Sequence, residues 1–358
     1  MFNALEHRAL SLYPSWPVVA NSLSKMSEAV FRRAIHAGTF VLGCATALAQ
    51  QPAPAGNVIG VGNFSHIVAN LDRSVRFYRD VIGLDVAGST RTFSGEVAMR
   101  AGNTPGARSL FTTLPVPGSA LGVEIIEYQD IERSPADPRL QDPGAAILAL
   151  TVRDLDSVLK RAKAAGIPFS SQRGLPTTHS DGGRVVVVRD PDGFFVELFQ
   201  PARTPQTLAP PSSNVVDSSF ALTVGRADRT IRLLKEVLGF ESPVGATSSD
   251  QALVDAIGPP GLQLRESRVM IPGSYVALSL LEFRGPAPAA RRTRLQDPGT
   301  PVLQLRVRGI ETLTSAWKAA GGEVVSTDGE PADLGAIKIV VFREPNNLML
   351  ELIEAVAR

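Results

Sequence analysis

The stretch FSHIVANLDRSVRFYRDVIGL, from Phe64 to Leu84, decides the fold of this chain. Its short apolar beginning predicts a strand over 64–69. Apolar residues then recur at helical spacing through 71–82, and Gly83 is typical of a helix end. The stretch therefore predicts a strand followed directly by an amphipathic helix.

The same pattern returns as FALTVGRADRTIRLLKEVLGF from Phe220. Four more pairs of similar segments follow the same order, at shifts of 154 to 156 residues: VEIIEY at 123 and LSLLEF at 278, LQDPG at 140 and 295, LTVRDLDSVLKRAKAAGIPF at 150 and LRVRGIETLTSAWKAAGGEV at 305, VVVVRDPDGFFVEL at 185 and IVVFREPNNLMLEL at 339. Such self-similarity predicts two homologous domains, 58–201 and 216–356. The Pro-, Ser- and Thr-rich segment 202–215 is the linker between them.

Each predicted domain divides again into two similar halves. In the first domain, the strand, helix and strands that begin at Phe64 are followed by a second strand at 146–152 and a second helix from Leu155. Further strands at 185–188 and 194–199 close this half. The chain is thus predicted to be an α+β protein of four βαβββ units.

The first 57 residues do not resemble a domain core. Arg32 and Arg33 precede an apolar run at 34–49 that ends in an A-x-A pattern, so 1–49 is predicted to be a signal peptide or leader and 50–57 a flexible linker. The run is too short for a comfortable membrane span, which predicts an exported, periplasmic or secreted protein. VLGC, ending at Cys44, leaves open a lipoprotein anchored through that cysteine.

Composition excludes several classes of function. Hydrophobic residues make up 44% and charged residues 20%, which is typical of a globular protein. A net charge of +1 shows no electrostatic footprint for nucleic acid, and a single cysteine excludes an intramolecular disulfide. The predicted partner is a small molecule, and the chain is expected to be a monomer or a homodimer.

The opening strand with its histidine, the following NLDRSVRFYRDVIGL, the later VEIIEY and the closing RDPDGFFVELFQP resemble the vicinal oxygen chelate superfamily. This family includes glyoxalase I, methylmalonyl-CoA epimerase, extradiol dioxygenases and the fosfomycin and bleomycin resistance proteins. The resemblance implies that βαβββ units curl in pairs into half-open barrels. It therefore implies two tandem glyoxalase-like half-barrel domains, each with a cup-shaped site.

The resemblance also implies four ligand positions for each cup. In the first domain these fall on His66, Glu124, Ile147 and Glu197. His66, Glu124 and Glu197 are therefore expected to bind a divalent metal such as Zn, Ni, Fe or Mn. Glu197 or Glu124 is the candidate base.

In the second domain the corresponding positions fall on Leu222, Ser279, Val302 and Glu351. Only one acid remains, so no metal is expected there. Glu351 is expected to have a structural role. The second domain is then a degenerate copy that supplies packing area or covers the first.

Three functions fit these residues. The first is a metal-dependent lyase or isomerase that acts on a small oxygenated compound through a chelated enolate. The second is a metal-free protein that sequesters a small molecule. An extradiol-type dioxygenase ranks below both, because it requires two histidines and one carboxylate around iron. Glutathione-dependent chemistry would be out of place for an exported protein.

Four other side chains are weaker candidates. His179 lies in a polar loop and is interpreted as a surface histidine, although a loop of this kind could close over a site. Arg91, Arg100 and Arg184 could hold an anionic substrate, and nothing in the sequence selects among them.

Overall fold

The computed structural model describes residues 57–171, 175–178, 182–203, 206–242, 247–248, 254, 262–284 and 292–356. The predicted leader, Cys44 and His179 lie outside these residues. Residues 56–358 form a single unit by their internal contacts. No helix in the described part of the chain is long and apolar enough to cross a membrane.

The first sequence repeat folds into two βαβββ units. Unit one comprises β1 (Val58–Ile67), α2 (Leu71–Arg76), the π-helical turn η1 (Phe77–Ile82), β2 (Ala87–Ser94), α3 (Glu96–Arg100), β3 (Arg108–Leu114) and β4 (Gly122–Gln129). Unit two comprises β5 (Ala146–Val152), α4 (Leu155–Ala164), β6 (Thr177–Thr178), β7 (Arg184–Arg189) and β8 (Phe195–Gln200).

The second repeat folds in the same order. Unit three comprises β9 (Val215–Thr223), α5 (Ala227–Leu238), β10 (Thr247–Ser248), β11 (Gln263–Met270) and β12 (Ala277–Arg284). Unit four comprises β13 (Pro301–Val307), α7 (Ile310–Ala319), β14 (Glu323–Val324), the 3₁₀ turn η3 (Thr327–Gly329), β15 (Ala332–Asp333), β16 (Ile337–Arg343) and β17 (Met349–Ala355). The predicted α+β class and its four units are confirmed.

Local sequence signals explain where the helices begin and end. The Asn70 side chain accepts a hydrogen bond from the Arg73 amide and caps α2, and Asp154 caps α4 in the same way. Gly83 ends η1 with a φ of 96°, a left-handed conformation that glycine adopts without a steric penalty. The strand–helix junctions of the repeat are therefore encoded locally.

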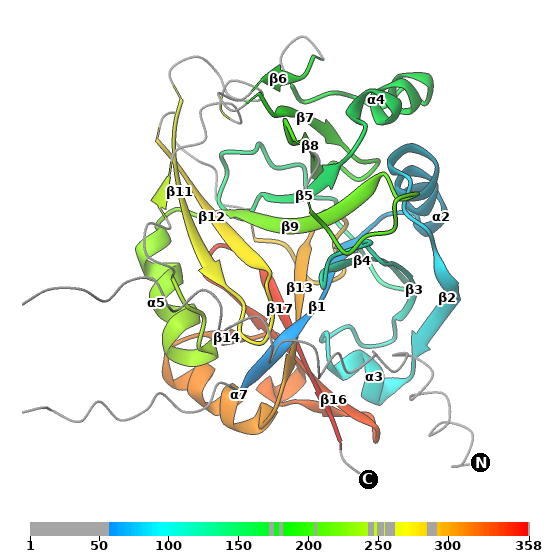
Figure 1. The fold of residues 1–358 in the computed structure, drawn as a ribbon. Helices are drawn as coiled ribbons and strands as arrows, with labels where there is room; N and C mark the ends of the chain where they lie inside the picture. The colour runs from blue at the N-terminus through cyan, green and yellow to red at the C-terminus, as the bar shows by residue number, and fades with distance from the viewer. Residues whose placement is uncertain are drawn as a thin grey trace, which may run out of the picture. The chain divides into compact units, whose positions relative to one another are not determined.

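The described strands form two sheets that cross the boundary between the repeats (Figure 1). Sheet A joins units one and four in the order β14-β16-β17-β13-β1-β4-β3-β2, with β15 beside β16. Sheet B joins units two and three in the order β10-β11-β12-β9-β5-β8-β7-β6. The antiparallel pairs β1–β13 and β5–β9 are the seams. Each half-barrel therefore takes one unit from each sequence repeat.

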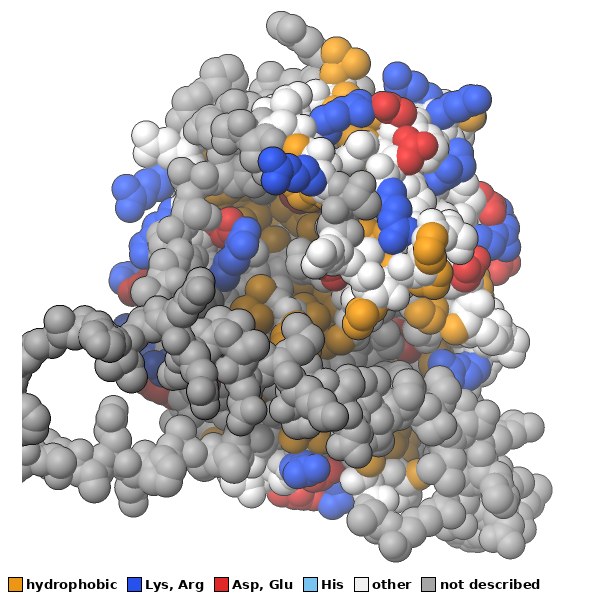
Figure 2. All heavy atoms as spheres, in the orientation of Figure 1, with side chains coloured by type: hydrophobic (Ala, Val, Ile, Leu, Met, Phe, Trp, Pro, Cys, Tyr) orange, Lys and Arg blue, Asp and Glu red, His pale blue; other side chains and the backbone are white. Residues whose placement is uncertain are grey.

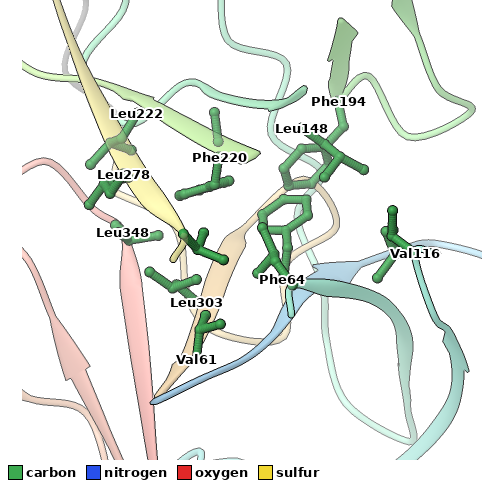
Figure 3. Packing of buried hydrophobic residues seen from close by; sticks show 14 of the residues in the cluster. Val61, Phe64, Val116, Leu148, Phe194, Phe220, Leu222, Leu278, Leu303 and Leu348 are labelled. Carbon is green, nitrogen blue, oxygen red and sulfur yellow. The ribbon is translucent and has the colours of Figure 1, made fainter. Parts of the chain in front are cut away.

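The main core lies between the two sheets and the helices. Phe64 and Phe220, which occupy equivalent positions in the two repeats, meet there with their ring centroids 4.7 Å apart (Figure 3). Leu148 and Leu303 are another equivalent pair in the same cluster. Side chains from both repeats are thus buried together, and this burial stabilises the crossed arrangement.

Candidate active site

Four polar side chains converge on one face of sheet A, which we call cup A. Ser65 on β1 lies beside Glu124 on β4, and Gln304 on β13 lies beside Glu351 on β17. The seam between β1 and β13 brings the two pairs together, because Ser65 pairs with Val302, two residues before Gln304. Residues two apart on a strand share a face, so all four side chains point the same way.

The Gln304 amide joins the two carboxylates of cup A. Its Nε2 donates to Glu124 Oε2 over 2.7 Å and to Glu351 Oε2 over 2.8 Å. Ser65 Oγ also donates to Glu124 Oε2, over 2.9 Å. On the other side of the amide, Gln304 Oε1 accepts from both the backbone N and Nδ2 of Asn63, each at 3.1 Å. The network fixes which way the amide points.

Burial makes both carboxylates weaker acids than usual. Burial raises the pKa of Glu124, while the hydrogen bonds from Ser65 and Gln304 and the charge of Arg91 lower it. Burial, followed by the negative charge of Glu124, raises the pKa of Glu351 to about 7. Glu124 is 3% exposed, whereas Glu351 is partly open to solvent. The pair therefore places a base with a pKa near neutral at the polar centre of cup A.

Two other polar groups belong to the same cup. Burial and then the charges of Glu351 and Glu124 raise the pKa of Tyr128, so its hydroxyl keeps its proton. The Arg91 guanidinium lies 4.8 Å from the centroid of the Phe111 ring. The remaining lining is apolar and includes these buried residues: Ile67, Ala98, Met99, Leu295, Val302, Val341 and Met349. Cup A thus combines a small polar centre with buried apolar neighbours.

The structure does not bring the three predicted metal ligands together. His66 follows Ser65 on β1, so it points away from Glu124 and into the core. Its Nδ1 lies 3.0 Å from Asp190 Oδ2 and 3.2 Å from the Tyr78 hydroxyl. The residue is fully buried. We therefore correct the sequence expectation: on β1 it is Ser65, and not His66, that faces the cup.

Glu197 lies in the other sheet. It is on β8, in register with Ala149 on β5, within sheet B. Glu124 belongs to sheet A, so the two acids do not share a cup. Glu351, for which the sequence suggested a structural role, is the acid that joins Glu124. The sequence paired the ligand positions within one repeat, whereas the sheets combine units from different repeats.

The side chains of cup A do not fit the expected divalent metal. Among the described residues, no group of three or more His, Cys, Asp or Glu side chains lies close enough to hold an ion. The cup offers no imidazole, and both carboxylates already accept hydrogen bonds from the Gln304 amide. An amide N–H cannot ligate a metal, so the group between the two acids is a donor instead of a ligand.

Sheet B carries a second face, cup B, on which Ile147, Glu197 and Ser279 lie. Ser279 donates to Glu266 over 2.7 Å, and Arg268 pairs with the same carboxylate at 2.8 Å. Figure 2 shows a hollow with a hydrophobic floor over the strands of sheet B, with charged side chains at its rim. The Glu124 position is Ser279 here, so the second acid of cup B is Glu266 on β11 and not a residue of β12.

The other predicted arginines take no part in either cup. Arg100 pairs with Asp328 at 2.8 Å, and Arg184 pairs with Asp156 at 2.7 Å, both at the surface. Only Arg91 of the three lies in cup A. Sequence reasoning missed Ser65 and Gln304. For Gln304 a signal existed, because it is an uncharged polar residue within the otherwise apolar run PVLQL.

The four βαβββ units and their two cups define a protein of the vicinal oxygen chelate class. Residues 60–198 match the family model described as the Glyoxalase/Bleomycin resistance protein/Dioxygenase superfamily. The chain therefore carries a domain that belongs to this superfamily, and the match covers the first sequence repeat. No curated protein sequence matches the chain.

Solved structures share the fold over more than four fifths of the chain. Glyoxalase I from Zea mays is 17% identical, with a TM-score of 0.54, and the match covers 82% of this chain and 92% of that one. A candidate dioxygenase from Bacillus subtilis is 16% identical, with a TM-score of 0.52, covering 85% and 87%. At such identities the similarity establishes the fold and leaves the reaction open.

Proposed function

We propose that the chain is a glyoxalase-like lyase or isomerase that moves a proton next to a carbonyl group in a small oxygenated compound. Cup A is its site and Glu351 its base. The observation that carries the proposal is the carboxylate of the half-buried Glu351, which is bonded through Gln304 to a second acid and whose pKa burial raises to about 7. A base with this pKa is half ionised at neutral pH and can both take and return a proton.

The proposed step begins when the Glu351 carboxylate removes a proton from the carbon beside the carbonyl. The C–H bond breaks, its electron pair forms the carbon–carbon double bond of an enolate, and the carbonyl oxygen becomes negative. The Arg91 guanidinium and the protonated Tyr128 hydroxyl are the groups of the cup suited to that oxygen. The carboxylic acid of Glu351 then returns the proton to carbon, or the enolate loses a leaving group.

The sequence expected this chemistry to depend on a divalent metal. Since the side chains of cup A do not fit the metal, no step of the proposal uses one. A metal-free protein that only sequesters its ligand remains the second candidate, and the hollow with a hydrophobic floor on sheet B favours it. The two functions differ in whether the ligand is chemically changed.

Deuterium exchange tests the proton transfer. Small carbonyl compounds such as dihydroxyacetone, hydroxyacetone and pyruvate are incubated with the protein in D2O, and loss of the C–H signal is followed by proton NMR. We expect exchange whose rate rises with pH through about 7, because the base must be ionised. Glu351→Gln should lower the rate at least about 100-fold, since this is the usual contribution of a general base.

Glu330→Gln is the matched control for this substitution. Glu330 is exposed, pairs with Lys318 and lies outside both cups, so its loss should leave the rate unchanged. Exchange that survives Glu351→Gln but disappears with Glu197→Gln would place the base in cup B and refute the proposal. Saturable binding of these compounds without exchange would favour the sequestering function.

We also propose that the protein is exported. The support is the basic pair Arg32-Arg33 before an apolar run that ends in an A-x-A pattern at 47–49. Mass spectrometry of the protein from expressing bacterial cells should find a chain that begins at Gln50, or at a lipidated Cys44. An intact N-terminus in the soluble cell interior would contradict export.

A further inference from the structure

Gln304 occupies the place between two acids where the expected metal would have to sit. We propose that its side-chain amide replaces the divalent cation in cup A, so that Glu124 and Glu351 are held as a working pair without metal. The inference rests on the proposed function for its catalytic meaning. It rests on the hydrogen bonds of cup A for its physical basis.

The orientation of the amide is fixed from the other side. Gln304 Oε1 accepts from the backbone N–H of Asn63, a group that can only donate. If the amide were reversed, its Nε2 would face this N–H and its Oε1 would face the carboxylates of Glu124 and Glu351. A donor would then face the Asn63 donor, and an acceptor oxygen would face the carboxylate oxygens. The NH2 group of Gln304 must therefore face the acids.

The opening strand leaves room for this amide. Gly62 lies on β1 opposite the Gln304 side chain, and a Cβ at Gly62 would come within 2.8 Å of Gln304 Cβ and 3.1 Å of Oε1. Real Cβ atoms essentially never come within 3.0 Å of a neighbour, so the 2.8 Å approach would force one of the two strands to shift. The glycine therefore lets Gln304 lie across β1 and reach Asn63.

The other cup provides an internal comparison. Gln304 and Ala149 occupy equivalent positions in the two repeats, as do Glu351 and Glu197. In each sheet they are register partners, Gln304 with Glu351 and Ala149 with Glu197. The glutamine is thus present where acids occupy both the Glu124 and the Glu351 positions. It is alanine in cup B, where Ser279 occupies the Glu124 position and the other acid, Glu266, lies on the next strand β11.

Two buried acids need a partner of this kind. Without one, each carboxylate would be desolvated and would face the negative charge of the other, which favours the protonated form of both. The Gln304 hydrogen bond lowers the pKa of each acid in opposition to burial. A neutral donor therefore performs the local task of a bridging cation, which is to keep the pair partly ionised.

A metal titration tests the replacement directly. Three metal-stripped proteins are titrated with Mn²⁺ and Zn²⁺ by calorimetry and Mn²⁺ EPR: wild type, Gln304→Glu and the control Gln296→Glu. Gln296 is a buried glutamine outside the hydrogen-bonded acid pair of cup A. We expect no saturable one-to-one binding to wild type or control up to about 1 mM metal. Gln304→Glu should bind one ion through three carboxylates, and the added change Glu351→Gln should abolish that binding.

Stoichiometric metal in wild type that is lost with Glu351→Gln would overturn the proposal. If Gln304→Glu does not fold, the wild-type titration still decides, and a second measurement supports it. Gln304→Ala and Gly62→Ala should each raise the Glu351 pKa by about one unit, because each removes or displaces the Gln304 hydrogen bond that lowers it. The pKa is measured by side-chain carbon NMR over a pH titration. An unchanged pKa in both variants would refute the role of the amide.

These readouts need no substrate. Failure of the deuterium exchange with a metal-free wild type would refute the proposed reaction and leave the role of Gln304 standing. Exchange that requires a bound metal would refute the role of Gln304 and leave proton transfer by Glu351 standing.

Discussion

Glu351 should make folding less favourable as the solution becomes neutral. Its pKa is about 7 in the folded protein, against 4.5 for an ordinary glutamate. Between these values the folded state keeps a proton that the unfolded chain releases. The stabilisation is therefore complete below the lower value and lost as the pH rises through about 7.

The size of the effect follows from the shift. Between about pH 5 and about pH 8, wild type should lose about 2 kcal/mol more unfolding free energy than Glu351→Gln, which cannot ionise. The full shift would give more, but solvent reaches part of this side chain. Urea unfolding of both proteins across this range measures the difference. Parallel pH profiles would show that Glu351 ionises normally in the folded state.

Single residues of the site were partly predictable. The resemblance to the vicinal oxygen chelate superfamily placed Glu124 and Glu351 at ligand positions of the cups, but it gave Glu351 only a structural role. Their meeting was not predictable, because it depends on which strands lie side by side. The raised pKa of Glu351 comes from the same meeting and could not be derived from the sequence around it.

At the scale of the strand, the face of β1 decides the role of His66. The sequence predicted a strand over 64–69, whereas β1 spans Val58–Ile67 and so begins six residues earlier. Its residues do not alternate between polar and apolar, so no pattern marks which face is inward. The register of β1 on β13 also shifts between Val61 and Phe64. An irregularity of one residue exchanges the two faces of a strand. His66 therefore lies in the core with Asp190, and Ser65 faces the cup.

The second repeat shows what the buried histidine replaces. Leu222 stands at the position of His66, and Leu234 at the position of Tyr78. Both leucines are fully buried in the shared core. The fold thus accepts either an apolar pair or a hydrogen-bonded polar cluster at this place. Such a substitution between repeats indicated a specialised residue, but it could not distinguish a metal ligand from a buried hydrogen-bonded side chain.

At the scale of the whole molecule, the four units were predictable and their pairing was not. Periodicity and the repeated motifs define each unit through local sequence. Every unit, however, offers the same free edge on its first strand, and hydrogen bonds between strand backbones carry little information about the partner. The structure pairs β1 with β13 and β5 with β9, so each cup takes one unit from each repeat.

This crossing predicts that neither repeat is stable alone. A fragment of residues 57–201 would expose β1 and β5 as unpaired edges and would remove Phe220 from the ring of Phe64. Exposed edges and apolar core surface favour aggregation or rearranged pairing. We expect this fragment to lack cooperative unfolding as a monomer, and to form a one-to-one complex when co-expressed with residues 206–358. Light scattering after size exclusion and urea unfolding measure both outcomes. A monomeric 57–201 fragment that unfolds cooperatively, and that shows no association with the second fragment, would contradict the crossed arrangement of the sheets.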